Sequence, residues 1–375
     1  MTMISRARPA LVFVILAAAF LLVGCGAAPA TGWSSATVAN QTVYFGSQTG
    51  KVFAVNAADG ALKWKFPKDD RSLGAMYSTP VVADSTVYFG AFDKKLYALD
   101  AATGDPKPGW QGFAAGNVIV ASPVASGGVV YFGSDDQKVY AVDAATGQMK
   151  WSAPFETGGQ VWADPALTEG ILYVGSLDHK MYALDPATGK LKWSKPFDAG
   201  GIIVTKPAVV NGIVYFGALS KLYALDAQTG EPKWREPFVA ESWIWSNPSV
   251  VSGVVYFGSL GGQVYAVDAL TGAAKWQTPF KTGNSVRSAI VVDKGVAYFG
   301  SDDYKVYAVD VESGKEKWSY KTENRIIASP AVANGMVYIP SFDQKMYALD
   351  AADGKLKWVV ETVNGQRVTP TPGAR

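Results

Sequence analysis

Short β-branched and aromatic runs, in which apolar residues alternate with others, recur along the chain. The clearest copy, residues 130–151, contains a Val-Tyr-Phe-Gly run, a Lys-Val-Tyr-Ala-Val-Asp run and a Lys-Trp pair. Such alternation places apolar side chains on one face of a strand. Asp143 and Gly147 mark a tight turn, because aspartate accepts backbone N–H groups and glycine adopts a positive φ. The pattern predicts antiparallel strands joined by short turns, and no copy has the 3.6-residue period of a helix.

This pattern occurs eight times, and its first tyrosine recurs at a mean spacing of 42 residues. That period is typical of a four-stranded propeller blade. The tyrosines are Tyr44, Tyr88, Tyr131, Tyr173, Tyr215, Tyr256, Tyr298 and Tyr338. The sequence therefore predicts an all-β fold, an eight-bladed β-propeller of four-stranded antiparallel blades that forms a single domain over residues 33–375.

A tryptophan follows the last turn of every copy. These residues are Trp64, Trp110, Trp151, Trp193, Trp234, Trp276, Trp318 and Trp358. Burial of one tryptophan removes about 150–250 Å² from water, a gross stabilisation of roughly 4–6 kcal/mol at about 25 cal/mol per Å². We therefore expect them to pack between blades as structural residues rather than to bind a ligand.

The first 32 residues differ from the rest and predict export. Two arginines precede an apolar run over residues 10–23, which is shorter than the about 20 residues of a spanning helix. Leu-Val-Gly-Cys at 22–25 resembles the bacterial lipobox, in which Cys25 would become the lipid-carrying first residue. We expect a lipoprotein signal peptide at 1–24 and a lipidated Cys25 with a short linker at 25–32. Lipid would anchor the protein at the periplasmic face of the outer membrane or the extracytoplasmic face of the cell membrane.

Charge and motif content narrow the function. Without the two leader arginines the chain has 32 basic and 32 acidic residues, and no basic run favours nucleic acid. His179 is the only histidine, and neither a nucleophile elbow nor a phosphate-binding glycine motif occurs. The pairs Asp135-Asp136 and Asp302-Asp303 lack the spacing of a calcium loop and are interpreted as turn residues. We predict no catalytic residue and no metal site.

Residues at the start of each innermost strand are expected to surround the mouth of the central channel. At these positions most copies of the repeat have a small polar or an aliphatic residue, but some have an aromatic or a charged one. The aromatic and charged residues are Trp33, Tyr77, Trp162, Asp164, Lys206, Trp243, Trp245, Arg287 and Arg325. Two interpretations remain open. One is an aromatic-lined pocket of mixed charge for a flat ligand or a partner segment, and the other is a set of aromatic side chains that fill a wide channel beside solvated charges.

The spacing Ala141-x-Asp143-x-x-Thr146-Gly147-x-x-x-Trp151 resembles the tryptophan-docking repeat of the pyrroloquinoline quinone (PQQ) propeller family. The resemblance covers residues 33–358 and implies the eight-bladed fold. It extends to two branches. Quinoprotein dehydrogenases bind PQQ and Ca²⁺ on top of the propeller and use an aspartate as base. Lipid-anchored, non-catalytic propellers of the BamB-like, Bam-complex branch help to insert outer-membrane β-barrels.

The chain departs from the dehydrogenase branch, because its single cysteine is assigned to lipid, its loops are short and no calcium-ligand set can be matched residue by residue. We therefore expect a non-catalytic scaffold without a resident cofactor. It would bind a protein partner of the envelope through exposed loops or a sheet edge. The alternatives are a PQQ-dependent dehydrogenase with PQQ and Ca²⁺, and an envelope ligand sensor that uses the aromatic mouth.

The C-terminal tail carries a further expectation. Gln-Arg-Val-Thr-Pro at 366–370 is similar to the strand start at 324–330. Each copy contains four predicted strands, so no strand needs to be shared between the ends of the chain. We expect the tail to compete with or extend residues 33–38 at the first blade.

Overall fold

The computed structural model describes residues 32–110 and 112–368. The strands of this part form eight sheets in which consecutive strands pair antiparallel. We number the sheets as blades 1 to 8 in chain order. The predicted signal peptide, Cys25 and the linker up to residue 31 lie outside the described residues.

The first four blades follow one another without insertion of another domain. Blade 1 contains β1 (Ala36–Ala39), β2 (Thr42–Gly46), β3 (Val52–Asn56) and β4 (Leu62–Phe66). Blade 2 contains β5 (Val81–Ala83), β6 (Thr86–Gly90), β7 (Lys95–Asp100) and β8 (Phe113–Ala114). Blade 3 contains β9 (Val124–Ser126), β10 (Val129–Ser134), β11 (Lys138–Asp143) and β12 (Phe155–Glu156). Blade 4 contains β13 (Ala166–Thr168), β14 (Ile171–Gly175), β15 (Lys180–Leu184) and β16 (Phe197–Asp198).

The last four blades repeat this order, and the eighth adds one strand. Blade 5 contains β17 (Ala208–Val210), β18 (Ile213–Ala218), β19 (Lys221–Asp226) and β20 (Phe238–Val239). Blade 6 contains β21 (Ser249–Val251), β22 (Val254–Gly258), β23 (Gln263–Asp268) and β24 (Phe280–Lys281). Blade 7 contains β25 (Val291–Asp293), β26 (Val296–Gly300), β27 (Lys305–Asp310) and β28 (Glu316–Lys321). Blade 8 contains β29 (Ala331–Ala333), β30 (Met336–Ser341), β31 (Lys345–Asp350), β32 (Leu356–Glu361) and β33 (Arg367–Val368).

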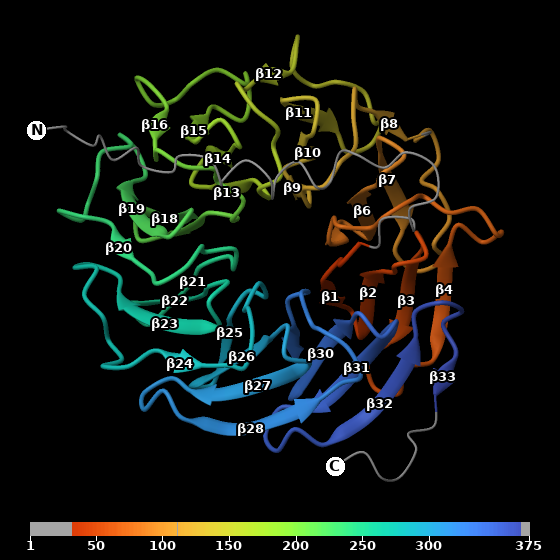
Figure 1. Ribbon diagram of the computed structural model, residues 1–375. Helices are drawn as coiled ribbons and strands as arrows, with labels where there is room; N and C mark the ends of the chain where they lie inside the picture. The colour runs from red at the N-terminus through yellow and green to blue at the C-terminus, as the bar shows by residue number, and fades with distance from the viewer. Residues whose placement is uncertain (1–31, 111, 369–375) are drawn as a thin grey trace, which may run out of the picture. The chain divides into compact units, whose positions relative to one another are not determined.

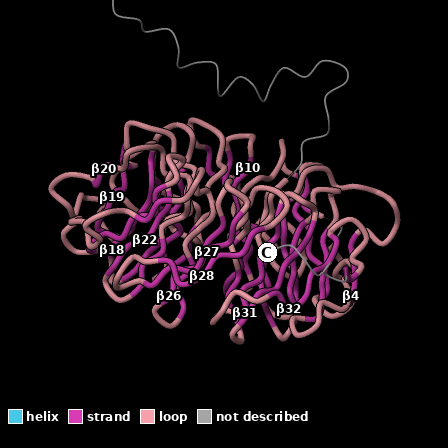
Figure 2. Tube along the Cα trace, turned by 60° about the horizontal axis from the view of Figure 1, so that its bottom comes forward, coloured by secondary structure: helices cyan, strands magenta, loops and turns pink. Residues whose placement is uncertain are grey.

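The blades form a closed ring. The first strand of each blade contacts the first strand of the next, and β29 contacts β1. Figure 1 shows the eight blades around a common centre, with the first strands innermost. Figure 2 shows strands joined by loops at the two faces of the ring. The predicted eight-bladed β-propeller is confirmed, with the one addition of a fifth strand in blade 8.

No helix of the described residues is long and apolar enough to cross a membrane.

The turns behave as their residues predict. In the two-residue turn between β17 and β18, Asn211 and Gly212 have φ values of 52° and 71°, as a type I′ turn requires. Asp143 caps the turn after β11, where its Oδ1 accepts the N–H groups of Ala145 and Thr146 at 3.0 Å. Gly147 has φ 70° there. These turns fix the register between paired strands, and the register determines on which face of the blade each apolar side chain lies.

The outer strands differ from the expected pattern. The tryptophan does not open a continuous strand in blades 2 to 6. There a two-residue strand follows the tryptophan, and a single bridged residue precedes it. Two residues separate the tryptophan from the paired phenylalanine in blade 2 and three in blades 3 to 6. Only one residue separates Trp64 from Phe66 and Trp318 from Tyr320, and β4 and β28 are continuous through both.

Indole rings join neighbouring blades. All eight predicted tryptophans are buried. Seven of them donate their Nε1–H to a backbone carbonyl of the following blade at 2.9–3.0 Å. The pairs are Trp64 with Ala101, Trp151 with Pro186, Trp193 with Ala227, Trp234 with Ala269, Trp276 with Val311, Trp318 with Ala351 and Trp358 with Ala57. Trp110 instead donates to Leu96 of its own blade at 3.4 Å, where residues 105–109 lengthen the turn.

The ring closes without an exchanged strand, as expected, but the tail does not join the first strand of blade 1. β33 pairs with the outer strand β32, with Val359 opposite Val368. The reason is a tight turn after β32, in which Gly365 has φ 78° and donates its N–H to Glu361 O at 2.9 Å. This turn reverses the chain beside β32, so β33 lies on the outer rim, away from the innermost β1.

Candidate binding face at the hub

Two sets of loops share one face of the ring, which we call the hub face. They are the loops from each outer strand to the next first strand, and the turns between second and third strands. Backbone bonds join the two sets: Leu260 N–H donates to Trp243 O at 2.8 Å, and Asp135 N–H donates to Val118 O at 3.0 Å. Side chains from different blades therefore meet on the hub face.

A ring of hydrogen bonds surrounds the centre of the propeller at the base of this face. It is formed by one residue per blade, just before the first strand, and we call it the hub ring. Its members are Ser35, Thr79, Ser122, Asp164, Lys206, Asn247, Ala289 and Ser329. In six of the eight steps, the backbone N–H of one member donates to the side-chain oxygen of the next at 2.6–3.3 Å. The link from Ser329 to Ser35 closes the ring between the last blade and the first.

The hub ring is interrupted at two places because Lys206 and Ala289 offer no side-chain acceptor. Beside the first interruption, Asp164 accepts the N–H of Ser122 at 2.6 Å. Burial raises the pKa of Asp164, and the opposite charge of Lys206 partly offsets this rise. Asp164 is half-buried and Lys206 exposed, so the one carboxylate of the ring lies beside a solvated ammonium group.

Aromatic side chains lie above the hub ring in blades 1 to 4. Trp33 and Tyr77 pack edge to face with centroids 4.4 Å apart, and Tyr77 also contacts Phe92 at 5.3 Å. Trp162 stands apart from them and donates its Nε1–H to Asp135 Oδ1 at 2.7 Å. These rings are therefore held by neighbours of the hub face and do not form one continuous wall.

A second group lies in blades 6 and 7, and we call Trp243, Trp245 and Arg287 the Trp-Arg patch. The guanidinium carbon of Arg287 lies 5.8 Å from the ring centroid of Trp245, within range of a cation–π interaction. Arg287 Nε donates to Asp302 Oδ2 at 3.0 Å. Trp243 is 41% exposed. The patch thus combines a charged group held in place on both sides with an indole that faces solvent.

The buried carboxylate of Asp302 has a second feature. Its side chain is only 9% exposed, and its Oδ1 has no hydrogen-bond partner among the described residues. In blade 3, the equivalent Asp135 receives the indole N–H of Trp162 from the next blade. Blade 8 has Ile327 at the position of Trp162, so the corresponding donor is missing beside Asp302.

Arg325 lies further along the hub face. Its guanidinium carbon is 4.5 Å from the ring centroid of Phe342, and its carbonyl accepts the N–H of Phe342 at 3.0 Å. The side chain is exposed. Arg325 therefore adds a second arginine–aromatic contact to the hub face, on the blade that follows the Trp-Arg patch.

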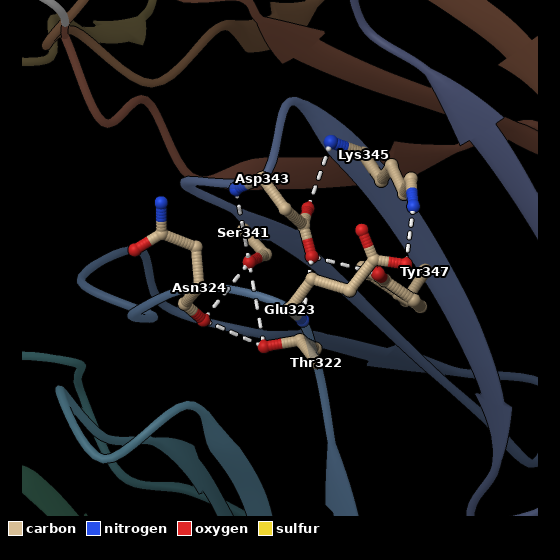
Figure 3. A network of polar contacts seen from close by, with 7 residues as sticks. All are labelled: Thr322, Glu323, Asn324, Ser341, Asp343, Lys345 and Tyr347. Atoms are coloured by element: carbon tan, nitrogen blue, oxygen red, sulfur yellow. Dashed lines mark hydrogen bonds and ion pairs between the residues drawn. The ribbon is translucent and has the colours of Figure 1, made fainter. Parts of the chain in front are cut away.

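A repeated polar network fixes these loops, and Figure 3 shows its copy in blade 8. Asp343 Oδ2 accepts the hydroxyl of Tyr347 at 2.7 Å and the N–H of Glu323 at 3.0 Å. Lys345 Nζ pairs with Glu323 at 2.7 Å. Burial, followed by the charge of Asp343 and the hydrogen bond to it, raises the pKa of Tyr347. Because the loop and the turn share these bonds, the backbone of the hub face is rigidly held.

The residues that were expected at the mouth of the channel do not line a single pocket. The structure places Arg287 against Trp245, two residues after the exposed Trp243. It puts Trp162 with Asp135 and Arg325 with Phe342. A cavity of about 460 Å³ lies at the outer rim between blades 6 and 7, away from the hub face, and is lined by residues 275–281 and 312–314. The hub residues thus form a surface of separate contacts.

Sequence reasoning missed the partners Asp135 and Asp302. Both were interpreted only as turn residues, yet the two members of each pair have different roles. The second members, Asp136 and Asp303, bond the tyrosine four residues later, whereas the first members receive Trp162 and Arg287. Their place directly after the buried serine of the turn was the available signal.

These carboxylates do not fit the calcium ion of a dehydrogenase. Asp135 lies in blade 3 and Asp302 in blade 7, and each is already bonded to an N–H donor. Within residues 32–110 and 112–368, no group of three or more His, Cys, Asp and Glu side chains is arranged to hold a metal ion. We therefore assign no step of any reaction to a bound metal or quinone.

Comparison with known families identifies the chain. The family described as outer membrane protein assembly factor BamB matches residues 23–153, 151–290 and 280–374. The chain belongs to this family. The three matched ranges together cover all eight blades. Comparison with curated protein sequences finds no significant match.

Solved structures share the fold with this member of the BamB family. BamB from Moraxella catarrhalis is 22% identical, with a TM-score of 0.68 over 82% of this chain and 91% of that one. The computationally designed protein Ika8 is 17% identical, with a TM-score of 0.73 over 85% and 96%. A europium-containing methanol dehydrogenase is 17% identical, with a TM-score of 0.66 over 85% and 82%. At these identities the likeness concerns the fold alone.

Proposed function

We propose that this protein is a non-catalytic scaffold of the bacterial envelope, anchored by lipid on Cys25, that binds a protein of outer-membrane β-barrel assembly through its hub face. Membership of a family described as an outer membrane protein assembly factor supports this role. The observation that carries the proposal for the site is the Trp-Arg patch, where Arg287 contacts the ring of Trp245 and the exposed Trp243 stands two residues before Trp245 in the same loop. Tryptophan and arginine are the side chains most enriched at energetically important positions of protein interfaces.

The geometry of the patch suits a protein partner. Arg287 is held between Asp302 and the ring of Trp245, so little side-chain freedom is lost when it binds. Pre-organised groups bind more tightly because the cost of ordering them has already been met. Asp302 pairs with Nε of Arg287, so the terminal guanidinium N–H groups can donate to a hydrogen-bond acceptor on the partner. Trp243, in the same loop as Trp245, offers a flat apolar surface.

A binding assay with matched variants tests this site. The purified barrel-assembly protein of the same bacterium is immobilised, and the scaffold is titrated over it. We expect Trp243→Ala and Arg287→Ala to weaken binding at least tenfold, about 1.4 kcal/mol. Leu270→Ala is the control, because Leu270 is 74% exposed but lies in the turn after β23, on the face opposite the hub face. Equal binding of all three variants would refute the assignment of the hub face.

Two further measurements test the anchor and the alternative activity. Cys25→Ser should move the protein from the membrane fraction to the soluble fraction and abolish incorporation of labelled fatty acid. Addition of PQQ and Ca²⁺ should leave the thermal melting curve unchanged and produce no alcohol-dependent dye reduction. A raised melting temperature together with dye reduction would instead support the dehydrogenase alternative and exclude a purely scaffolding role.

A further inference from the structure

Two exposed aromatic side chains belong to neighbouring blades of the hub face. Among the described residues, only Trp243 and Tyr304 are both aromatic and exposed, at 41% and 42%. Trp243 stands in the loop that leads into blade 6, and Tyr304 stands in the turn between β26 and β27 of blade 7. Tryptophan and tyrosine are enriched at energetically important positions of protein interfaces. The hub face of blades 6 and 7 thus carries the side chains that most often contribute to binding.

The backbone of Tyr304 has an unfavourable conformation. Its φ is 75°, in the left-handed region that glycine adopts freely and a bulky side chain opposes. Seven of the eight turns between second and third strands have such a residue three positions after the small buried residue at which the turn begins, with φ values of 65–82°. These residues are Gly50, Lys94, Gln137, His179, Gly262, Tyr304 and Gln344. Tyr304 is the only aromatic one among them, although glycine fits the position, as Gly50 and Gly262 show.

The turn holds Tyr304 in this conformation through bonds to its backbone. Its N–H donates to Ser301 O at 3.2 Å, and its carbonyl accepts the N–H and the hydroxyl of Thr322 at 2.8 and 2.9 Å. Gln344 makes the three equivalent bonds in blade 8 at 2.7–3.2 Å. None of these bonds uses the side chain of Tyr304 or of Gln344. The phenol ring is therefore not needed to build the turn.

Tyr304 is linked to the Trp-Arg patch through Asp302. Asp302 stands two residues before Tyr304 in the same turn, and its Oδ2 accepts Nε–H of Arg287 at 3.0 Å. Trp243 stands two residues before Trp245, whose ring centroid lies 5.8 Å from the guanidinium carbon of Arg287. Each exposed ring is thus two residues away from a group that contacts the same guanidinium. A partner bound at Arg287 lies within reach of both rings.

We propose that Tyr304 is a partner-binding residue of the hub face, and that the chain keeps its ring in an unfavourable backbone conformation because the barrel-assembly protein binds it. Residues in sparsely populated backbone conformations cluster at binding sites. Tyrosine suits this role because it offers a large amphipathic surface and has little side-chain freedom to lose. The inference rests on the proposed function and extends it: the partner presents apolar surface to Trp243 and Tyr304, and a hydrogen-bond acceptor to Arg287.

Replacement by glycine in the full chain separates binding from stability. Tyr304→Gly removes both the ring and the strain, so it should raise the melting temperature and weaken binding to the immobilised barrel-assembly protein at least tenfold. Gln344→Gly is the matched control, because Gln344 is exposed and has φ 65° in the equivalent turn. It should also raise the melting temperature, but it should leave binding unchanged. Weaker binding together with a lower melting temperature for Tyr304→Gly would overturn the proposal, because the ring would then serve the fold.

The other outcomes distinguish this inference from the function that it extends. If Trp243→Ala and Arg287→Ala weaken binding but Tyr304→Gly binds as tightly as Gln344→Gly, the inference is wrong and the proposed function stands. If only Tyr304→Gly weakens binding, Tyr304 is a binding residue and the Trp-Arg patch is not. If the wild-type protein does not bind the barrel-assembly protein, both are wrong. Sedimentation of the wild-type protein adds one more test: a dimer that Tyr304→Gly dissociates would overturn the inference by assigning the ring to a second copy.

Discussion

The packing of a glycine against each indole gives the sharpest test of how the blades are joined. Gly189 lies in the turn after β15 with φ 72°, and a Cβ added there would lie 2.7 Å from Cδ2 of Trp151 in the preceding blade. Gly212 has nearly the same φ, 71°, but a Cβ there would have no atom within 4 Å. Alanine at the two positions therefore separates backbone strain from the indole contact.

The expected magnitudes follow from these two environments. A left-handed conformation costs a non-glycine residue about 1–2 kcal/mol, so Gly212→Ala should lose about that amount. Gly189→Ala has the same strain and must also push Trp151 out of a packed joint, which costs about 1–3 kcal/mol more. We expect Gly189→Ala to lose roughly 2–5 kcal/mol in total. Such a loss is a large fraction of the typical 5–15 kcal/mol of net stability, by order of magnitude.

Urea unfolding followed by far-UV circular dichroism measures the difference between the variants. The same substitution in a Trp151→Leu background closes a double-mutant cycle, and there the excess cost of Gly189→Ala should vanish because the clash is gone. If Gly189→Ala is no more destabilising than Gly212→Ala, the indole is not tightly packed against the turn. In that case the account of how the blades are joined is wrong.

Three further predictions concern charges and the hub ring. Ala289→Ser gives the hub-ring N–H of blade 6 an acceptor and should stabilise by about 0.5–1.5 kcal/mol, whereas Ser329→Ala should cost about as much, both measured by urea titration. Hydrogen bonds from lysines lower the pKa of Asp226 and Asp268 from 3.8 to about 2, so their stabilisation is complete above about pH 4 and is lost as pH falls toward 2. Asp226→Asn should make melting temperature less dependent on pH in that window. Burial raises the pKa of Asp164, so Asp164→Asn should raise the melting temperature at pH 7.

The fold was predictable because it is encoded by local repetition. The period of the tyrosines and tryptophans determines the number of blades, and the Asp143–Gly147 turn explains how each copy reverses. The interruption of the outer strands in blades 2 to 6 was not predicted, although the spacing from Trp318 to Tyr320 is shorter than that from Trp151 to Phe155. The alternation of apolar residues does not show whether one or three residues between the tryptophan and the next aromatic residue keep the outer strand paired with the third strand. The pairing of β33 with β32 was not predicted either. It depends on the turn at Gly365, which forms only when β32 is in place in blade 8.

The candidate site was predicted less completely, because its contacts cross between blades. The sequence placed Trp162 and Arg287 near the channel, and the position of Asp135 and Asp302 after the serine of the turn was the only sign that they would bind these residues. Each pair joins a turn of one blade to a loop of the same or the next blade. The two residues come within hydrogen-bonding distance only because of the way the blades pack. The hub ring is hidden for the same reason, since Ser35 and Ser329 are 294 residues apart.

The closure between blades 8 and 1 uses the same hydrogen bonds as most other joints between blades. Trp358 donates to Ala57 O, and Ser329 N–H donates to Ser35, as the equivalent residues do at most other joints. The ring of blades therefore does not require the chain to begin and end at this joint. A circular permutant could begin at any blade, provided that a connection like residues 322–327 replaced the break before Trp33. The terminus that carries the proposed lipid anchor could then be moved around the circumference. That would change which blade the anchor holds nearest the membrane without altering a contact between blades.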